Sequence, residues 1–184
     1  MKEEILPAYD RTEEIKSLFS EYTQMLMAND ADFEQYLQIQ NYAAELEHLN
    51  DKYGMPDGRL YLLCVNGKPA GCIGLRKIDH VACEMKRLYV TPAFRGHHFA
   101  EHLVVKIIED AKEIGYQTIL LDTLPFLQSA IHLYQKLGFF ETAPYNDSPL
   151  ERTIFMRLDL NRDRPDAEDF VRHEFERTGK PIQS

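Results

Sequence analysis

Residues 89–111 read YVTPAFRGHHFAEHLVVKIIEDA. This stretch predicts the end of a strand, a turn, and a long helix whose first turn carries Arg95, Gly96 and two adjacent histidines. A turn of this kind can cradle a phosphate, bind a metal through His97 and His98, or cap a helix. The rest of the chain has to decide among these three.

The segment at residues 95–100 has the makings of an anion site. A helix N-terminus offers four unpaired N–H groups and the positive end of the helix dipole. A glycine there, such as Gly96, lets the backbone approach an anion closely. The segment is therefore a candidate pyrophosphate seat. The alternative is a strand-to-helix turn that needs Gly96 only for its geometry.

A metal site at His97 and His98 is disfavoured. Adjacent residues at a helix start point about 100° apart, so one ion does not readily accept both rings. No cluster of Cys, Asp or Glu follows at ligand spacing. We therefore expect no metal in the site.

Apolar periodicity divides the whole chain into strands and helices. The Asn66-Gly67 pair favours a tight type I′ hairpin between two of the strands. Asp32 is a candidate cap for the second helix. The order predicts a mixed α/β sandwich around one core. The expected elements are a strand at 2–8, helices at 11–28 and 32–49, a loop at 52–58, strands at 59–65, 70–78 and 83–90, a helix from 95 to 114, a strand at 117–123, a helix at 125–137 and two strands at 139–142 and 151–160.

Composition limits the classes of function. The chain has 184 residues, a net charge of −9 and a pI near 5.2, and its lysines and arginines are scattered. It therefore lacks the basic stripe of a nucleic-acid binder. No segment approaches the ~20 apolar residues that span a membrane, and the start has no apolar run typical of a signal peptide. We expect a cytoplasmic protein with no nucleic-acid or membrane partner.

The length suits one domain, which we place at residues 1–160. A polar tail follows at 161–184, with a short helix expected at 166–177 that packs on the body or on a second subunit. Cys64, Cys72 and Cys83 each lie in an apolar, strand-like run, so they are expected to be reduced core residues. A catalytic cysteine with a neighbouring histidine is the alternative.

Two longer stretches resemble the GNAT family of N-acetyltransferases. Residues 84–123 read EMKRLYVTPAFRGHHFAEHLVVKIIEDAKEIGYQTILLDT, and residues 129–142 read SAIHLYQKLGFFET. Their order and spacing, after a helix pair and a strand meander, carry the resemblance over residues 2–160. It implies a mostly antiparallel central sheet that is splayed in the middle and flanked by helices on both faces.

The resemblance also implies a place for acetyl-CoA, with no metal. The thioester would enter the gap between the strands at 83–90 and 117–123. The pantetheine arm would pair with the backbone of Leu88, Tyr89 and Val90. The pyrophosphate would be held by the backbone amides of residues 95–100, which are Arg95, Gly96, His97, His98, Phe99 and Ala100.

One residue departs from the family pattern. His98 stands where the loop of similar proteins carries a second glycine. A side chain is tolerable there if the residue has right-handed helical angles, because only a positive φ would exclude it. With such angles the imidazole would lean away from the phosphates or donate to them.

Two residues are candidates for the chemistry. Glu84 matches a carboxylate that acts as a base in similar enzymes, and its alternative is an exposed strand glutamate paired with Lys86 or Lys112. Tyr134 matches a tyrosine that acts as general acid near the sulfur. Its alternative is a helix tyrosine packed in the core.

The resulting hypothesis is an acetyl-CoA-dependent N-acetyltransferase that acetylates a primary amine directly. The alternative is a sensor or regulatory module that binds acyl-CoA without turnover. A nucleotide-binding protein is disfavoured because the GxxxxGK[ST] and GxGxxG signatures are absent.

The acceptor, a small-molecule amine or a peptide amine, is left open by the sequence. Specificity is expected from the two N-terminal helices and from residues 52–58 and 143–151. The carboxylates that could attract a cation there, or serve only as surface charges, are Glu45, Glu47, Asp51, Asp57 and Asp147.

Overall fold

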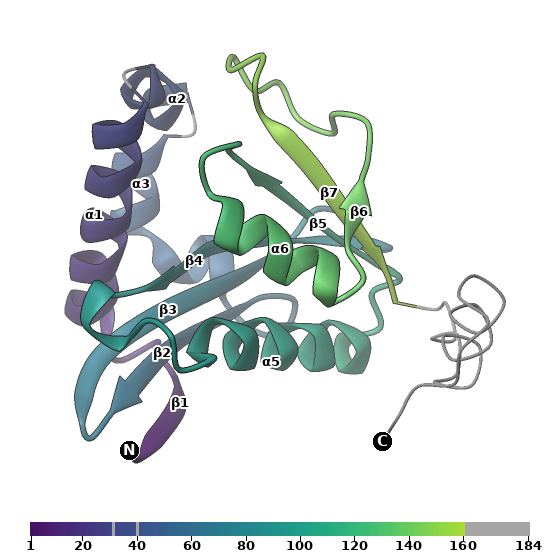
Figure 1. Ribbon diagram of the computed structural model, residues 1–184. Coiled ribbons are helices and arrows are strands. Elements are labelled where there is room, and N and C mark those ends of the chain that lie inside the picture. The colour runs from purple at the N-terminus through teal and green to yellow at the C-terminus, as the bar shows by residue number, and fades with distance from the viewer. Residues whose placement is uncertain (31, 40, 161–184) are drawn as a thin grey trace, which may run out of the picture.

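The elements follow the expected order along the chain (Figure 1). A computed structural model describes residues 1–30, 32–39 and 41–160. The tail at 161–184, with the helix and the homodimer contact expected of it, lies outside these residues. The elements are β1 (Glu3–Pro7), α1 (Thr12–Asn29), α2 (Phe33–Ile39), α3 (Tyr42–Glu47), α4 (Leu49–Tyr53), β2 (Arg59–Val65), β3 (Lys68–Lys77), β4 (Ala82–Val90), the 3₁₀ turn η1 (Pro92–Phe94), α5 (Phe99–Ile114), β5 (Thr118–Thr123), α6 (Gln128–Lys136), β6 (Phe140–Glu141) and β7 (Ile154–Asp159).

The strands form one sheet in the order β1-β2-β3-β4-β5-β7-β6. Its neighbours are antiparallel, apart from the parallel pair of β4 and β5. That pair is short: the register runs from Ala82 opposite Thr118 to Glu84 opposite Leu120. Beyond Glu84 the two strands separate, as Figure 1 shows. The mixed, mostly antiparallel and splayed sheet is therefore confirmed.

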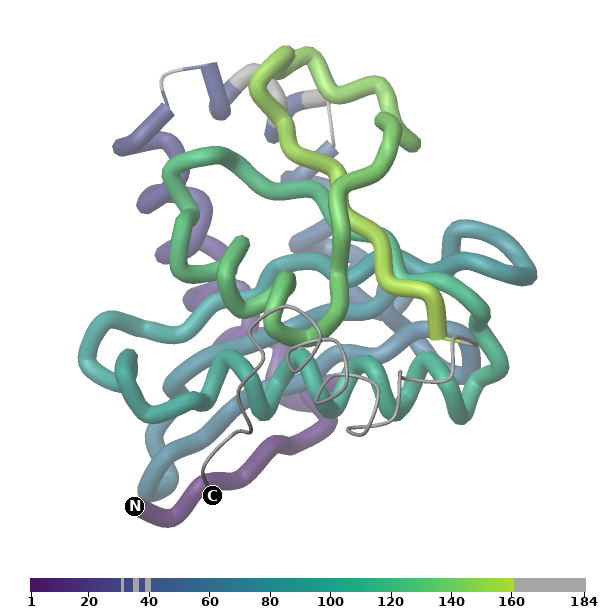
Figure 2. Tube along the Cα trace, turned by 45° about the vertical axis from the view of Figure 1, so that its right-hand side comes forward, coloured from purple at the N-terminus to yellow at the C-terminus, as the bar shows by residue number. Residues whose placement is uncertain are grey.

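Successive side chains of a strand point to opposite faces of the sheet, and both faces are buried under helices. Leu63, Ile73 and Met85 belong to a core that α5 and α6 cover. Leu62 and Cys72 belong to a second core on the opposite face, under α1 and α4. The N-terminal helices and the pair α5 and α6 lie on opposite sides of the sheet in both views (Figures 1 and 2). Strand register thus decides which residues of β4 face each side.

The second expected helix is in fact three short ones. Asn41 adopts left-handed angles, with φ 54°, and His48 is not helical, with φ −129° and ψ 49°. These two residues break the run at 32–49 into α2, α3 and α4. The loop expected at 52–58 begins only at Gly54, because Tyr53 ends α4 and is fully buried.

The other local predictions hold with shifted ends. Asn66 and Gly67 have φ 51° and 75°, the two positive values that a type I′ turn requires. The three cysteines are free and buried, as predicted, and burial raises the pKa of Cys83 to about 12. Among the described residues, no helix is both long and apolar enough to cross a bilayer.

Gly74 on β3 allows α4 to pack closely. A Cβ built on Gly74 would lie 2.6 Å from Cε1 of Tyr53. The ring cannot move aside easily, because it is fully buried and its hydroxyl donates to Oε1 of Glu45 at 2.7 Å.

We predict that Gly74→Ala lowers the free energy of unfolding by about 1 to 3 kcal/mol, the usual effect of overpacking a core. Urea unfolding measures it. The same substitution made in a Tyr53→Leu background should cost much less, since the clash is gone. Equal costs in both backgrounds would contradict this packing account.

Candidate active site

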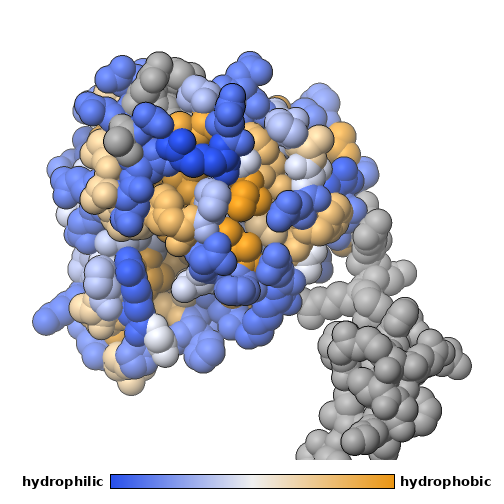
Figure 3. Space-filling view, turned by 45° about the horizontal axis from the view of Figure 1, so that its top comes forward, coloured by the Kyte–Doolittle hydropathy of each residue, from blue (hydrophilic) through white to orange (hydrophobic). Residues whose placement is uncertain are grey.

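The split between β4 and β5 opens into two joined cavities. The outer one, of about 730 Å³, is lined by the end of β4, by the loop before α5 and by α6. The inner one lies between residues 85–88 of β4 and residues 121–124, which are the end of β5 and the residue after it. Tyr22, Leu88, Leu127 and Tyr134 line both cavities. The molecule is hollowed in the middle of the face shown in Figure 3, where apolar side chains gather between hydrophilic ones.

The loop before α5 differs from the sequence prediction. The helix begins at Phe99 rather than at Arg95, so the histidines precede it. Gly96 has φ 81°, and a Cβ added there would meet nothing within 4 Å. The Arg95 guanidinium folds back, and its Nε donates to the carbonyl of Val90 at 3.1 Å.

His98 does not meet the condition of right-handed helical angles. It has φ 62° and ψ 8°, the left-handed conformation that favours glycine, and it stands at the N-cap of α5. Such angles cost a residue with a side chain about 1 to 2 kcal/mol. The imidazole does lean away: it is 75% exposed, and its Nδ1 lies 3.4 Å from Oε2 of Glu101.

The loop presents backbone donors that have no partner. Within the described residues, the amides of Gly96, His97 and His98 make no hydrogen bond. The amides of Phe99 and Ala100 lie in the first turn of α5, where the helix provides no carbonyl four residues earlier to accept from them. The line of amides therefore forms an anion seat at the positive end of a sixteen-residue helix. No cluster of metal-ligating side chains occurs among the described residues.

β4 carries a bulge next to the inner cavity. Cys72 of β3 pairs with Tyr89, whereas Gly74 pairs with Lys86, so β4 holds one extra residue between them. Arg87 occupies the bulge with φ 61°. Beyond Glu84, the edge of β4 that faces β5 has no strand partner among the described residues. Leu88, Tyr89 and Val90 lie along this edge and can offer backbone groups to a ligand, apart from the Val90 carbonyl, which accepts from Nε of Arg95.

A buried ion pair holds this bulge. Nε and Nη2 of Arg87 donate to the two oxygens of Glu45 on α3, both at 2.9 Å. Lys52 and Tyr53 donate to the same carboxylate. Burial alone would raise the pKa of Glu45, but the hydrogen bonds and charges of Arg87 and Lys52 hold it well below its usual range.

Tyr134 lies where the two cavities meet. Its side chain is 7% exposed, and its ring lies 5.8 Å from that of Phe139. Within the described residues its hydroxyl makes no hydrogen bond. Burial, and then the charges of Tyr22 and Asp122, raise the pKa of Tyr134 well above its usual value. The hydroxyl therefore stays protonated and is available to a ligand as a donor.

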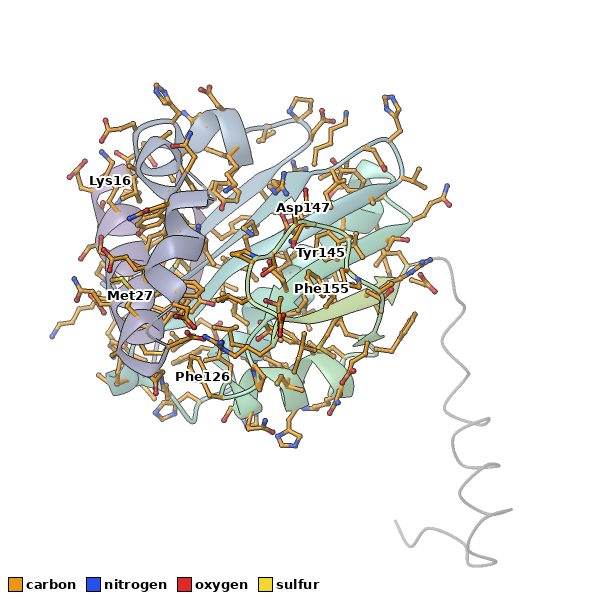
Figure 4. All side chains as sticks on the ribbon, turned by 90° about the horizontal axis from the view of Figure 1, so that it is seen from above. Lys16, Met27, Phe126, Tyr145, Asp147 and Phe155 are labelled. Atoms are coloured by element: carbon orange, nitrogen blue, oxygen red, sulfur yellow. The ribbon has the colours of Figure 1, made fainter. Side chains whose placement is uncertain are left out.

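Glu84 is fully buried, so the exposure in its alternative reading is wrong, whereas the pairing with Lys86 in that reading is present. Its carboxylate accepts hydrogen bonds from Arg76, from Lys86 at 3.4 Å and from the Tyr145 hydroxyl at 2.7 Å. Figure 4 shows Tyr145 over the sheet, between Asp147 and Phe155. Glu84 lines a third cavity, on the side of α3 and α4, and not the inner one.

Asp122 is the carboxylate of the inner cavity, and sequence reasoning missed it. Its Oδ1 lies 3.9 Å from Nζ of Lys86, across the split, and its Oδ2 accepts from Nδ2 of Asn146 at 3.1 Å. A usable signal was present: an aspartate near the end of an otherwise apolar strand that borders the expected gap.

Comparison with known proteins agrees with this geometry. The family model described as "Acetyltransferase (GNAT) family" matches residues 14–139. The chain belongs to the GNAT acetyltransferase family. It is therefore an acyltransferase, and membership implies acyl transfer from coenzyme A.

Relatives and solved structures give the same result. An uncharacterized N-acetyltransferase of Schizosaccharomyces pombe is 36% identical over 152 residues, which span 82% of this chain and 89% of the relative. A GNAT acetyltransferase structure from Staphylococcus aureus Mu50 matches with a TM-score of 0.68 and 22% identity, over 87% of this chain and all of that one. The PaiA N-acetyltransferase of Thermoplasma acidophilum, solved in complex with coenzyme A, matches with a TM-score of 0.64 and 17% identity, over 86% and 99%. These two structures support the GNAT fold.

We predict that His98→Gly raises the free energy of unfolding by about 0.5 to 1 kcal/mol. Glycine removes the cost of left-handed angles, but it loses more conformational entropy on folding than histidine does, which offsets part of the gain. Its affinity for coenzyme A should be equal to or better than that of the wild type. Urea unfolding and calorimetric titration measure the two quantities.

His97→Gly is the matched control, because φ of His97 is not positive. That variant should lose stability. If His98→Gly bound coenzyme A more weakly, the imidazole would be part of the seat.

Proposed function

We propose that this GNAT enzyme transfers an acetyl group from acetyl-CoA directly to a primary amine. The observation that carries the proposal is the Tyr134 hydroxyl, which faces the junction of two cavities and makes no hydrogen bond within the described residues. A purely structural tyrosine of this burial would donate to a neighbour.

The outer cavity fits coenzyme A. The amides of residues 96–100 suit a pyrophosphate, and the unpaired edge at Leu88, Tyr89 and Val90 suits the amide groups of a pantetheine arm. A ligand laid along both would bring its thioester to the junction beside Tyr134. The Thermoplasma structure, which holds coenzyme A in the same fold, supports this assignment.

The chemistry is nucleophilic attack of the amine nitrogen on the thioester carbonyl, with loss of the thiolate. The backbone amides near residues 88–90 polarise the carbonyl oxygen. A carboxylate receives the proton that the ammonium must lose. Tyr134 donates to the sulfur as the C–S bond breaks.

For the carboxylate, the geometry favours Asp122 over Glu84. Asp122 lines the cavity that contains Tyr134, whereas Glu84 lies outside it and already accepts from two cations and a tyrosine. Burial is the main reason why the pKa of Tyr134 is raised, and the charges of Tyr22 and Asp122 add to it.

The alternative is an acyl-CoA sensor, or regulatory module, without turnover. His98 in the loop favours it, while Tyr134 and Asp122 at one cavity favour the enzyme. Thiol release from acetyl-CoA with a panel of amines decides between them. A sensor would bind the thioester but release no thiol above the rate in water. We propose a cytoplasmic location and a small-molecule or peptide amine as the acceptor.

Tyr134→Phe should lower kcat by about 10² to 10⁴-fold, the usual contribution of a positioned acid. The ring and its packing against Phe139 are kept, so melting temperature and coenzyme A affinity should hold. The measurement is turnover together with thermal unfolding. A stable and fully active variant would remove Tyr134 from the mechanism.

Asp122→Asn should lose rate most near neutral pH and recover toward alkaline pH, where more of an amine with a pKa near ~10 is already deprotonated. Glu84→Gln should instead lose melting temperature, because Arg76 and Lys86 lose their charged partner, and should keep the wild-type shape of the pH–rate curve. The reverse result, with the profile changed only in Glu84→Gln, would make Glu84 the base.

A further inference from the structure

A cluster of charged side chains lines the split on the side of α3 and α4. We name it the charged seam. It extends along the third cavity, of about 820 Å³, which meets the inner cavity at Lys86. Its members come from α3, α4, β3, β4 and β5: Glu45, Lys52, Arg76, Glu84, Lys86, Arg87 and Asp122.

Lys86 makes long contacts with its partners in the seam. Its side chain is 6% exposed, yet its Nζ lies 3.4 Å from Oε1 of Glu84 and 3.9 Å from Oδ1 of Asp122. The neighbouring Arg87 makes two bonds of 2.9 Å to Glu45. An ammonium has three N–H donors. Within the described residues Lys86 places one of them, in a long hydrogen bond.

The charges of the seam do not balance. Its four cations face three carboxylates, which leaves one positive charge in excess at a site where buried charge needs a partner. The other charged groups of this cavity lie at its rim. Lys77 and Asp57 pair with each other at 3.0 Å, and Asp51 and Asp147 are exposed to solvent.

We propose that the acceptor carries a carboxylate beside its amine, as an α-amino acid does, and that Lys86 binds that carboxylate. This inference rests on the proposed amine acetylation. The carboxylate would pair locally with Lys86 and accept from its two remaining donors, while the zwitterion as a whole leaves the net charge of the seam unchanged. The amine would then turn toward Asp122, on the opposite side of the split.

The spacing of the two groups supports this assignment. Nζ of Lys86 and Oδ1 of Asp122 are 3.9 Å apart, so an ammonium and a carboxylate on one carbon can each reach a partner of opposite charge. An acceptor with only cationic groups would place a second cation against Lys86. The open third cavity leaves room for the rest of the molecule.

The test uses pairs of acceptors that differ only by the carboxylate: an amino acid and the amine formed by its decarboxylation. The wild-type enzyme should prefer the amino acid in kcat/KM. Lys86→Met should lower the ratio of the two kcat/KM values by about 10- to 100-fold, the usual effect of losing a hydrogen bond to a charged group. Lys77→Met is the matched control and should keep the wild-type ratio, because its lysine pairs at the rim of the same cavity.

Two further readouts keep the inference testable if Lys86→Met folds poorly. Lys86→Gln retains a donor without the charge and should show the same loss of ratio. Calorimetric titration of the wild type with coenzyme A bound should show tighter binding of the N-acetylated amino acid than of the matching acetamide.

Equal kcat/KM for the two acceptors in the wild type would overturn the inference and leave the proposed function standing. An unchanged ratio in both Lys86 variants would do the same. No thiol release with either series, while coenzyme A still binds, would overturn the proposed function together with the inference.

Discussion

The site depends on the short pairing of β4 with β5. Three residues of each strand pair, from Ala82 opposite Thr118 to Glu84 opposite Leu120, and everything functional lies beyond the last pair. A fully paired β4 would direct its backbone groups to β5. The split instead leaves one edge of Met85–Val90 unpaired, and the line of amides before α5 lies at the same opening. A long ligand can therefore bind between two strands of one sheet, along an edge where the Val90 carbonyl already accepts from Nε of Arg95.

A cluster of charged side chains lines the split on the side of α3 and α4. Arg87 stands in a β-bulge and Glu45 on α3, so their double hydrogen bond ties the N-terminal helices to β4 where the strand departs from β5. Glu84 belongs to the last pair, and its carboxylate accepts hydrogen bonds from Arg76 of β3 and from Tyr145 in the loop at 142–153. Buried ion pairs add little net stability but penalise every arrangement that separates them. We infer that they keep the split at one geometry.

Local sequence patterns predicted most of the fold. The apolar runs of β2 to β4, the Asn66-Gly67 turn and the glycines after α5 and α6 act over a few residues, and the chain obeys them. What failed depended on backbone angles or on distant contacts. The break at Asn41 and the left-handed His98 are tolerated because other parts of the structure hold them, and no local rule predicts that. Tyr134 could be chosen from a motif, whereas Asp122 had only the weaker signal of an aspartate in an apolar strand, and its position opposite Lys86 required the structure. The burial of Glu84 depended on Arg76 and Tyr145, which lie 8 and 61 residues away in the chain.

We propose that the unpaired amides on the two sides of the split bind coenzyme A. Amide hydrogen exchange, with and without saturating coenzyme A, is the measurement to make. Exchange should slow in the bound state at the loop and first turn of α5, residues 96–100, and along the free edge of β4 at 85–90, with little change in β1 and β2. Protection confined to other segments, or none at 96–100 despite calorimetrically measured binding, would contradict it.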